Sequence, residues 1–130
     1  MTRVTGIGGI FLKARDPDAL RGWYRDHLGV DVQSWGGATF RWHDPATPDE
    51  GVTVWSVFPS TSGYFDPSTA PFMVNYRVAN LPAVLDTLRA EGCTVDDRME
   101  ESEYGKFGWV MDPEGNRVEL WEPPPGRFPG

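Results

Sequence analysis

Two stretches decide the fold of this chain, GIFLKARD at residues 9–16 and MVNYRVAN at residues 73–80. Each is typical of a strand that runs into a polar residue able to cap a helix. They lie 64 residues apart, about half of the 130-residue chain. Each half later carries Asp-Pro followed by a glycine and another strand pattern, at Asp44-Pro45 and at Asp112-Pro113. This spacing predicts an internal duplication.

Each predicted helix has its own start and stop signals. Asp16 and Asn80 suit the N-cap position, while Gly29 and Gly92 suit a left-handed residue at the end of a helix. Between these ends, apolar side chains recur at helical spacing: Leu20, Trp23, Tyr24 and Leu28 in the first half, and Leu81, Val84, Leu85 and Leu88 in the second. The sequence therefore predicts one helix in each half.

After each helix the pattern changes to strands. Strands are expected at residues 31–35, 38–42 and 52–58 in the first half, and at residues 94–99, 106–111 and 117–121 in the second. Each half then has the order βαβββ, with half-modules at about 5–58 and 71–122 inside a single domain over 1–130. The predicted fold class is α+β, with two βαβββ modules forming a curved mixed-sheet cup and the helices outside. Residues 59–71, rich in Ser, Thr, Pro and aromatics, are expected to be the linker.

The amino-acid composition indicates which kinds of partner and which cellular compartment to expect. The formal net charge is −7 and no Lys/Arg-rich run occurs, so neither nucleic acid nor an anionic membrane surface is an expected partner. No segment approaches the roughly 18 apolar residues of a membrane span, and the N-terminus does not resemble a signal peptide. The chain has one cysteine, Cys93, which cannot form an internal disulfide. We therefore expect a cytoplasmic protein whose partner is a small organic molecule.

The duplicated pattern resembles a known superfamily. Its motifs are DPDALRGWYRDHLG at residues 16–29 and GWVMDPEGNRVELW at residues 108–121. Together they resemble the vicinal oxygen chelate superfamily, which includes glyoxalase I, extradiol dioxygenases and the bleomycin- and fosfomycin-resistance proteins. The resemblance covers residues 7–123, nearly the whole chain, and implies the cup fold described above. It also implies a homodimer, in which the Pro-rich tail would act as an arm.

The same resemblance implies where a metal would bind. In the metal enzymes of this superfamily, four ligands from the first and last strands of each half face into the cup. The corresponding positions here are Gly9, Trp55, Met73 and Glu119, and a slip of the alignment would bring Asn75 into play. Among these residues only Glu119 suits a hard or borderline divalent ion, and one carboxylate cannot complete a coordination shell. We therefore expect no metal and no cofactor.

Strand alternation predicts which side chains line the cup. Because Val118 and Leu120 suit the helix side, Glu119 should face the cup. The same reasoning, extended by the repeat, gives a set of substrate-binding residues: Phe11, Arg41, Trp55, Asn75 and Trp109, with Tyr104 at the rim. A buried Glu119 carboxylate needs a partner or a ligand, and Arg41 and Arg77 are the candidate partners.

Two classes of function stay open at this point. The first is a small-molecule-binding protein of the glyoxalase/bleomycin-resistance type, which holds its ligand in an aromatic cup without metal. The alternative is a glyoxalase-like or dioxygenase-like enzyme, whether lyase, isomerase or oxidoreductase, that uses Glu119 as a metal ligand or as a catalytic acid/base. His43, at a strand end, is a further candidate base. The missing metal ligands and the six tryptophans favour binding, while the retained Glu119 favours catalysis.

Overall fold

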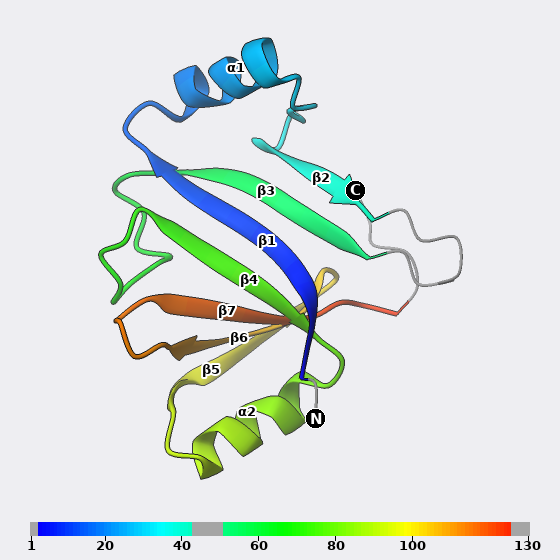
Figure 1. The fold of residues 1–130 in the computed structure, drawn as a ribbon, viewed down its shortest axis with the longest axis vertical. Coiled ribbons are helices and arrows are strands. Elements are labelled where there is room, and N and C mark those ends of the chain that lie inside the picture. Colours follow the sequence, from blue (N-terminus) through cyan, green and yellow to red (C-terminus); the bar gives the residue numbers. More distant parts are fainter. Residues whose placement is uncertain (1–2, 43–50, 126–130) are drawn as a thin grey trace.

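The computed structural model describes residues 3–42 and 51–125. It contains two helices and seven strands (Figure 1). In chain order they are β1 (Val4–Ala14), α1 (Pro17–Leu28), β2 (Gly37–Arg41), β3 (Val52–Pro59), β4 (Phe72–Val78), α2 (Leu81–Ala90), β5 (Thr94–Ser102), β6 (Gly105–Met111) and β7 (Arg117–Glu122). Neither helix in these ranges has the length and apolarity that crossing a bilayer requires.

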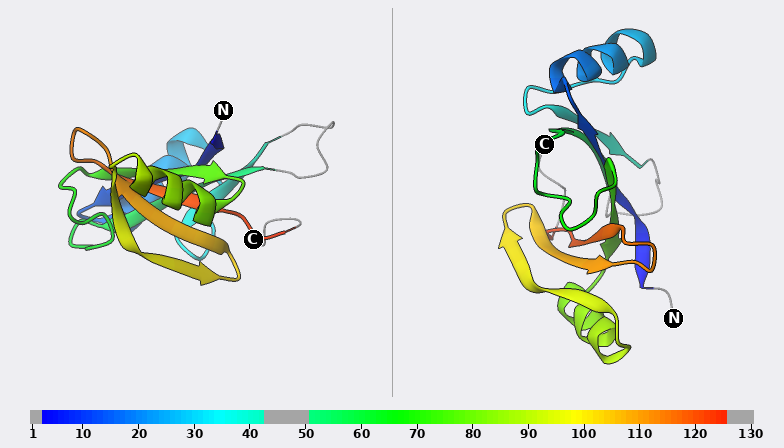
Figure 2. Two further views of the ribbon diagram at one scale, coloured as in Figure 1. Left: turned by 90° about the horizontal axis from the view of Figure 1, so that it is seen from below. Right: turned by 90° about the vertical axis from the view of Figure 1, so that its left-hand side faces the viewer.

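The strands form one open, mixed sheet in the order β2-β3-β1-β4-β7-β6-β5. At its centre, β1 and β4 pair antiparallel and join the two halves of the chain. On either side of this pair, β3 runs parallel to β1 and β7 runs parallel to β4. Figure 2 shows the sheet bent between α1 and α2, with the chain after β3 inside the curve. The predicted α+β class with a curved mixed sheet is therefore confirmed.

Both helices begin and end where the sequence predicts. The carboxylate of Asp16 accepts a hydrogen bond from the Ala19 amide at 3.1 Å, and the Asn80 side chain accepts one from the Ala83 amide at 3.1 Å. Each bond satisfies one of the amides that the first helical turn leaves without a partner. Gly29, with φ of 68°, ends α1 in the left-handed conformation that glycine adopts without strain.

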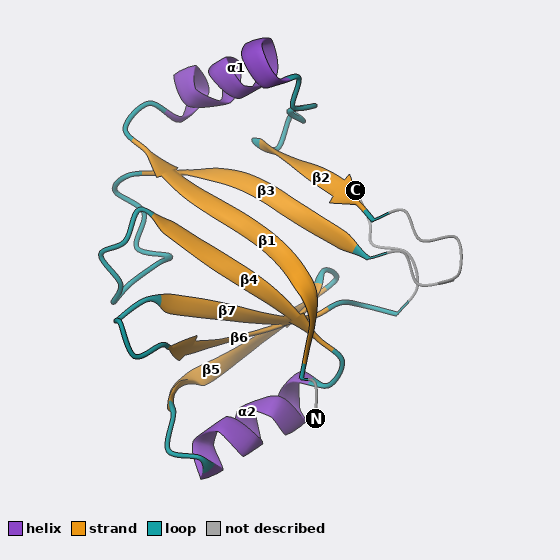
Figure 3. Ribbon diagram, in the orientation of Figure 1, coloured by secondary structure: helices purple, strands orange, loops and turns teal. Residues whose placement is uncertain are grey.

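One predicted strand is absent, and the first half has three strands where the second has four (Figure 3). Residues 31–35 do not form a strand because the chain turns back on itself there. The Gln33 amide donates to the Gly37 carbonyl at 2.7 Å, and the Gly36 amide donates to the Gln33 carbonyl at 3.0 Å. Gly36 takes a φ of 98° in this turn, so β2 follows directly.

The core consists of three clusters on the two faces of the sheet. Under α1, Leu20 and Tyr24 pack against Trp55 and its neighbours. Under α2, the buried cluster is Val78, Leu81, Leu85 and Leu120. The third cluster fills the inside of the curve and contains Phe11, Phe65, Met73 and Trp109. Phe65 comes from the segment 60–71, so the predicted linker is folded into the cup and is part of its core.

Candidate functional site

The inside of the curve holds a cavity of about 490 Å³. Most of its lining is aromatic: Phe11, Trp35, Phe58, Tyr64, Tyr104, Phe107 and Trp121. Its polar side chains are Thr39, Asn75, Glu119 and the hydroxyl-bearing tyrosines, and no Lys or Arg of the described chain is among the lining residues. A concave, mostly apolar space with a few converging polar groups is the usual form of a small-molecule site.

Glu119 is the acid of this cavity. It lies on β7, and its residue surface is only 1% exposed. Three side chains donate hydrogen bonds to its carboxylate. Tyr64 Oη donates to Oε2 at 2.5 Å, Trp109 Nε1 donates to the same oxygen at 2.9 Å, and Asn75 Nδ2 donates to Oε1 at 2.6 Å. The carboxylate is therefore fixed from three sides by neutral donors.

Burial and hydrogen bonding act on the Glu119 carboxyl in opposite directions. Removal from water favours the neutral form and raises its pKa above the ordinary value for glutamate. The hydrogen bonds from Tyr64, Asn75 and Trp109, and then the charge of Arg117, oppose this shift without cancelling it. Glu119 in turn acts on Tyr64, because burial and the adjacent carboxylate both raise the pKa of the Tyr64 phenol. Tyr64 is therefore a neutral donor at physiological pH.

Asn75 presents an unused acceptor next to the carboxylate. Its side chain is buried, and Asn75 Oδ1 has no hydrogen-bond partner. The atom lies beside Gly8, at the β-bulge where β1 shifts its register against β4. A Cβ on Gly8 would lie 2.3 Å from Asn75 Oδ1 and 2.7 Å from Trp121 Cε3, so only glycine fits at this point of β1.

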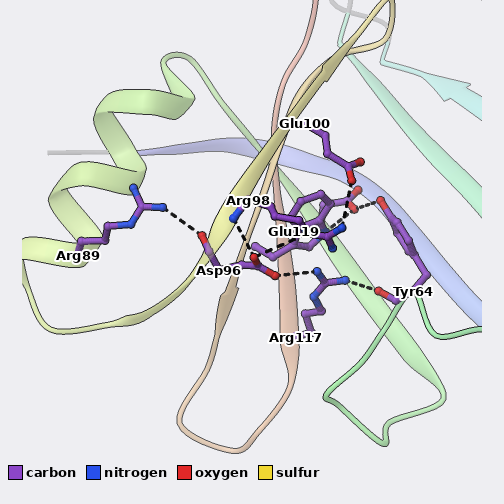
Figure 4. A network of polar contacts seen from close by, with 8 residues as sticks. Tyr64, Arg89, Asp96, Arg98, Glu100, Arg117 and Glu119 are labelled. Carbon is purple, nitrogen blue, oxygen red and sulfur yellow. Dashed lines mark hydrogen bonds and ion pairs between the residues drawn. The ribbon is translucent and has the colours of Figure 1, made fainter.

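Arg117 holds the segment 60–71 in the cup (Figure 4). Its guanidinium donates through Nη1 to the Tyr64 carbonyl and through Nη2 to Asp96 Oδ2, the latter at 3.3 Å. It also lies 4.6 Å from the ring centroid of Trp109. The Tyr64 ring is stacked on Phe58, with centroids 5.5 Å apart and planes 7° from parallel. These contacts fix the Tyr64 hydroxyl in its position against Glu119.

The structure places four of the predicted site residues on the cavity. Phe11, Asn75 and Glu119 line its interior, and Tyr104, 46% exposed, lies at its rim. The prediction that Asn75 and Glu119 face the same side is confirmed, because they pair in register between β4 and β7 and share a hydrogen bond. The roles of these four residues in binding or catalysis remain predictions.

The prediction for Trp55 is wrong. Trp55 lies on the opposite face, under α1, where its ring is 5.0 Å from that of Tyr24. In the first half of the chain, Gly9 of β1 pairs with Val54 of β3, and in the second half Asn75 of β4 pairs with Glu119 of β7. Val54 therefore has the position in the first half that Glu119 has in the second. A register that differs by one residue turns every side chain of a strand to the other face.

Two further predicted residues do not line the main cavity. Trp109 is 1% exposed and lies next to Glu119 on the adjacent strand β6, where its hydrogen bond positions the carboxylate. Arg41 is at the end of β2, two residues beyond Thr39, the β2 residue that lines the cavity. The groups that stabilise the anionic form of Glu119 are the three neutral donors and Arg117, rather than the predicted Arg41 or Arg77. His43, the candidate base, lies outside the described residues.

Sequence reasoning missed Tyr64, which comes from the segment expected to be a linker. Two adjacent aromatic residues, Tyr64 and Phe65, stand there among Ser, Thr, Gly and Pro. Large aromatic side chains are costly to leave in water, and this pair is the one local signal that the segment folds back onto the core. Which partner Tyr64 reaches is set by contacts 55 residues away in the sequence, at Glu119.

The side chains at this site do not fit a divalent metal. Glu119 is the only carboxylate at the positions that the resemblance implies, and both of its oxygens already accept hydrogen bonds. Across residues 3–42 and 51–125, no three His, Cys, Asp or Glu side chains gather as metal ligands would. A hard divalent ion needs more oxygen or nitrogen donors than Glu119 and Asn75 provide.

Comparison with known proteins places the chain in a family. A family model described as a glyoxalase-like domain matches residues 9–121, while no curated protein matches. A methylmalonyl-CoA epimerase from Mycobacterium tuberculosis shares 20% identity over 96% of this chain and 92% of that chain, with a TM-score of 0.61. A methylmalonyl-CoA epimerase in complex with methylmalonyl-CoA and NH4+ shares 17% identity over 97% and 99% of the two chains, with a TM-score of 0.68.

A variant of the Streptomyces coelicolor methylmalonyl-CoA epimerase, in complex with 2-nitronate-propionyl-CoA, shares 16% identity over 97% of this chain and 99% of that chain, with a TM-score of 0.68. At these identities the three structures establish a common fold and no common activity. The family match and the shared fold confirm the resemblance to the vicinal oxygen chelate superfamily, and the chain belongs to the glyoxalase-like domain family.

Proposed function

We propose that this domain is an enzyme that moves a proton on a small organic molecule held in the cup, with Glu119 as the acid/base. The observation that carries the proposal is a single buried carboxyl in an apolar cavity, with its pKa raised by desolvation. The fold is shared with solved structures named as methylmalonyl-CoA epimerases.

The surrounding residues supply what such a step needs. The aromatic walls bind an apolar body and exclude water, which strengthens the electrostatic contacts inside. Tyr64, Asn75 and Trp109 hold the carboxyl in one orientation and stabilise it when it is ionised. Burial stabilises it when it is protonated. A carboxyl whose pKa is raised by burial can take a proton from a substrate carbon and return it.

No step of this proposal passes through a metal, because the donor set does not fit one. Elemental analysis of the purified protein after dialysis should find well below one equivalent of zinc, nickel, manganese or iron per chain. A stoichiometric metal that survives dialysis would contradict the proposal and would point to ligands outside the described residues.

Proton exchange into deuterium oxide tests the acid/base role directly. Phenylacetone and aminoacetophenone carry exchangeable hydrogens next to a carbonyl, and loss of their α-hydrogen signals can be followed by proton NMR. Wild type should accelerate the exchange of at least one probe, and Glu119→Gln should lose the acceleration by about 10²-fold or more. Glu114→Gln, in the exposed β6–β7 turn, is the matched control and should keep the wild-type rate. Equal exchange in wild type and Glu119→Gln would refute the role of Glu119.

A binding protein is the second candidate, and one observation favours it. Glu119 is almost fully covered, and both of its oxygens are already engaged by donors. A site of this kind can hold a ligand by affinity alone, as in bleomycin-type resistance. Tight binding of a probe with no exchange in any variant would support this second function. In either case we propose a cytoplasmic location, since the chain carries a single cysteine and no disulfide.

A further inference from the structure

The hydrogen-bonding groups on the cavity floor are mainly acceptors. Asn75 Oδ1 is buried without a donor, and an unpaired buried acceptor is destabilising. Directly opposite Asn75 in the strand pair, Glu119 presents a carboxylate, whose ionised oxygens only accept hydrogen bonds. The groups that would complement this floor are therefore donors. Among common ligand groups, an ammonium brings three donors and no acceptor.

The walls of the cavity suit the same chemistry. The face of an aromatic ring carries partial negative charge and attracts a cation. The protein already uses this attraction around the cup, since Lys13 Nζ lies 5.0 Å from the centroid of Phe65 and the Arg117 guanidinium lies 4.6 Å from that of Trp109. No such cation is present inside the main cavity, because no Lys or Arg in the part of the chain that the structure describes lines it.

Other charge classes fit this site less well. An anionic ligand would place its charge near Glu119 without any lining cation to offset it, and the formal net charge of −7 would oppose its approach. A neutral ligand without a donor would leave Asn75 Oδ1 unpaired. A cation is attracted by the Glu119 carboxylate, by the Asn75 amide oxygen and by the faces of the aromatic rings.

We propose that the cup selects a cationic ligand, an organic amine or ammonium with an apolar, ring-sized body, and that Glu119 and Asn75 receive its nitrogen. The proposal deepens the proposed function and rests on it in one respect, that the same cavity is the ligand site. Gly8 contributes to the placement of the acceptor, because a Cβ at position 8 would lie 2.3 Å from Asn75 Oδ1 and would displace the amide.

Three probes with the same phenethyl-type body and different charge test the proposal: phenethylammonium, phenethyl alcohol and hydrocinnamate. Trp35 and Trp121 line the cavity, so tryptophan fluorescence reports binding. At about pH 8 the amine is protonated and the carboxylate ionised. Phenethylammonium should bind at least about tenfold more tightly than phenethyl alcohol, and hydrocinnamate should bind most weakly.

Two variants test whether Glu119 is the origin of the preference for the ammonium. Glu119→Gln should reduce the ammonium-over-alcohol ratio to within about threefold. Glu114→Gln removes the same charge from the exposed β6–β7 turn and should leave the ratio unchanged. Circular dichroism confirms that each variant is folded.

The possible outcomes separate this proposal from the proposed function. Equal binding of the ammonium and the alcohol, tightest binding of hydrocinnamate, or a ratio that Glu119→Gln leaves intact would overturn the cation preference while the cup stays a ligand site. If none of the three probes binds at millimolar concentration, the cup is not a site for ligands of this size, and both proposals fall.

Discussion

At the scale of single residues, Glu119 combines near-complete burial with three neutral hydrogen-bond donors. Its raised pKa makes stability depend on pH. The folded state keeps the proton to a higher pH than the unfolded chain does. The free energy of unfolding therefore falls as pH rises from the ordinary glutamate pKa to the folded one, by up to about 1.4 kcal/mol per pH unit, and is constant above that window.

Glu119→Gln removes this titration, so its stability relative to wild type should increase as pH rises through the window. The amide of Asn75 can turn to present its oxygen to the new Gln side chain, so the fold should be retained. Urea unfolding of both proteins at several pH values between about 4 and 8 measures the difference. A difference that does not change with pH would show that the carboxyl titrates alike in the folded and unfolded chains.

Tyr64→Phe keeps the ring that stacks on Phe58 and removes the hydroxyl that donates to Glu119. The loss of a hydrogen bond to a charged group should cost about 1.5–3 kcal/mol when Glu119 is ionised, and less when it is protonated. It should also raise the Glu119 pKa further, because one donor that favours the anion is gone. Carbon-13 NMR of the glutamate carboxyls would follow the titration.

A double-mutant cycle provides the control for Tyr64→Phe. In the Glu119→Gln background, the same tyrosine substitution no longer removes a bond to a charge, so its cost should be smaller. Additive effects of the two substitutions would mean that Tyr64 and Glu119 are not energetically coupled.

At the scale of elements, the two helices are attached to the sheet with different strength. α2 buries Leu81 and Leu85, and the Leu81 amide donates to Glu122 Oε1 of β7 at 2.8 Å. α1 contains no buried residue. Hydrogen exchange should therefore be faster at the amides of α1 than at those of α2. Slower exchange in α1 would mean that contacts such as that of Tyr24 with Trp55 hold the helix on the sheet more strongly than its low burial indicates.

The same difference between α1 and α2 should appear when their N-cap side chains are removed. Asn80→Ala removes the N-cap of a helix docked on the core and should lower the free energy of unfolding by about 1 kcal/mol. Asp16→Ala removes the matching cap of α1, and more of its effect should be confined to local fraying of that helix. Urea unfolding and exchange rates separate the two effects.

Features encoded within a few residues could be predicted from the sequence. The helix ends at Asp16, Gly29 and Asn80 are of this kind, since each depends on local hydrogen bonds and local backbone conformation. The alternation of side chains along β7, which puts Glu119 and Leu120 on opposite faces of the sheet, is also of this kind. Such local signals, together with the resemblance to the superfamily, predict the fold class and the position of Glu119 in the cup.

Features that depend on distant partners could not be predicted. The face of Trp55 is set by the register of β3 against β1, and no local pattern fixes that register. Residues 31–35 form a turn because Gln33 finds the Gly37 carbonyl, although their composition also suits a short strand. Tyr64 reaches Glu119 only because Arg117 holds its backbone, a contact 53 residues apart in sequence.

At the scale of the whole molecule, we predict a homodimer. The sheet is not closed, and both β2 and β5 end it as edge strands. Large apolar side chains are also exposed near the first of these edges, including Trp35 and Phe40. Burial of such surface favours association. Of the expected arm at residues 123–130, the part 126–130 lies outside the described residues.

Light scattering at micromolar concentration should give twice the chain mass of 14.5 kDa. Substituting Phe40 with serine, on the exposed face of β2, should weaken the association if this edge takes part. A mass that stays at the single-chain value would contradict a stable dimer.

The central pair of strands has a stereochemical consequence. Along β4 and β7, Asn75 is paired with Glu119, while the matching pair along β1 and β3 is Gly9 with Val54. The carboxyl of this row therefore belongs to the second half of the chain, and the corresponding position in the first half carries the hydrocarbon side chain of Val54. Under the proposed function, a ligand that lies across the two halves would present one of its two enantiotopic faces to the carboxyl. Under the proposed function, we therefore expect the exchange catalysed by Glu119 to favour one of the two enantiotopic hydrogens of a substrate.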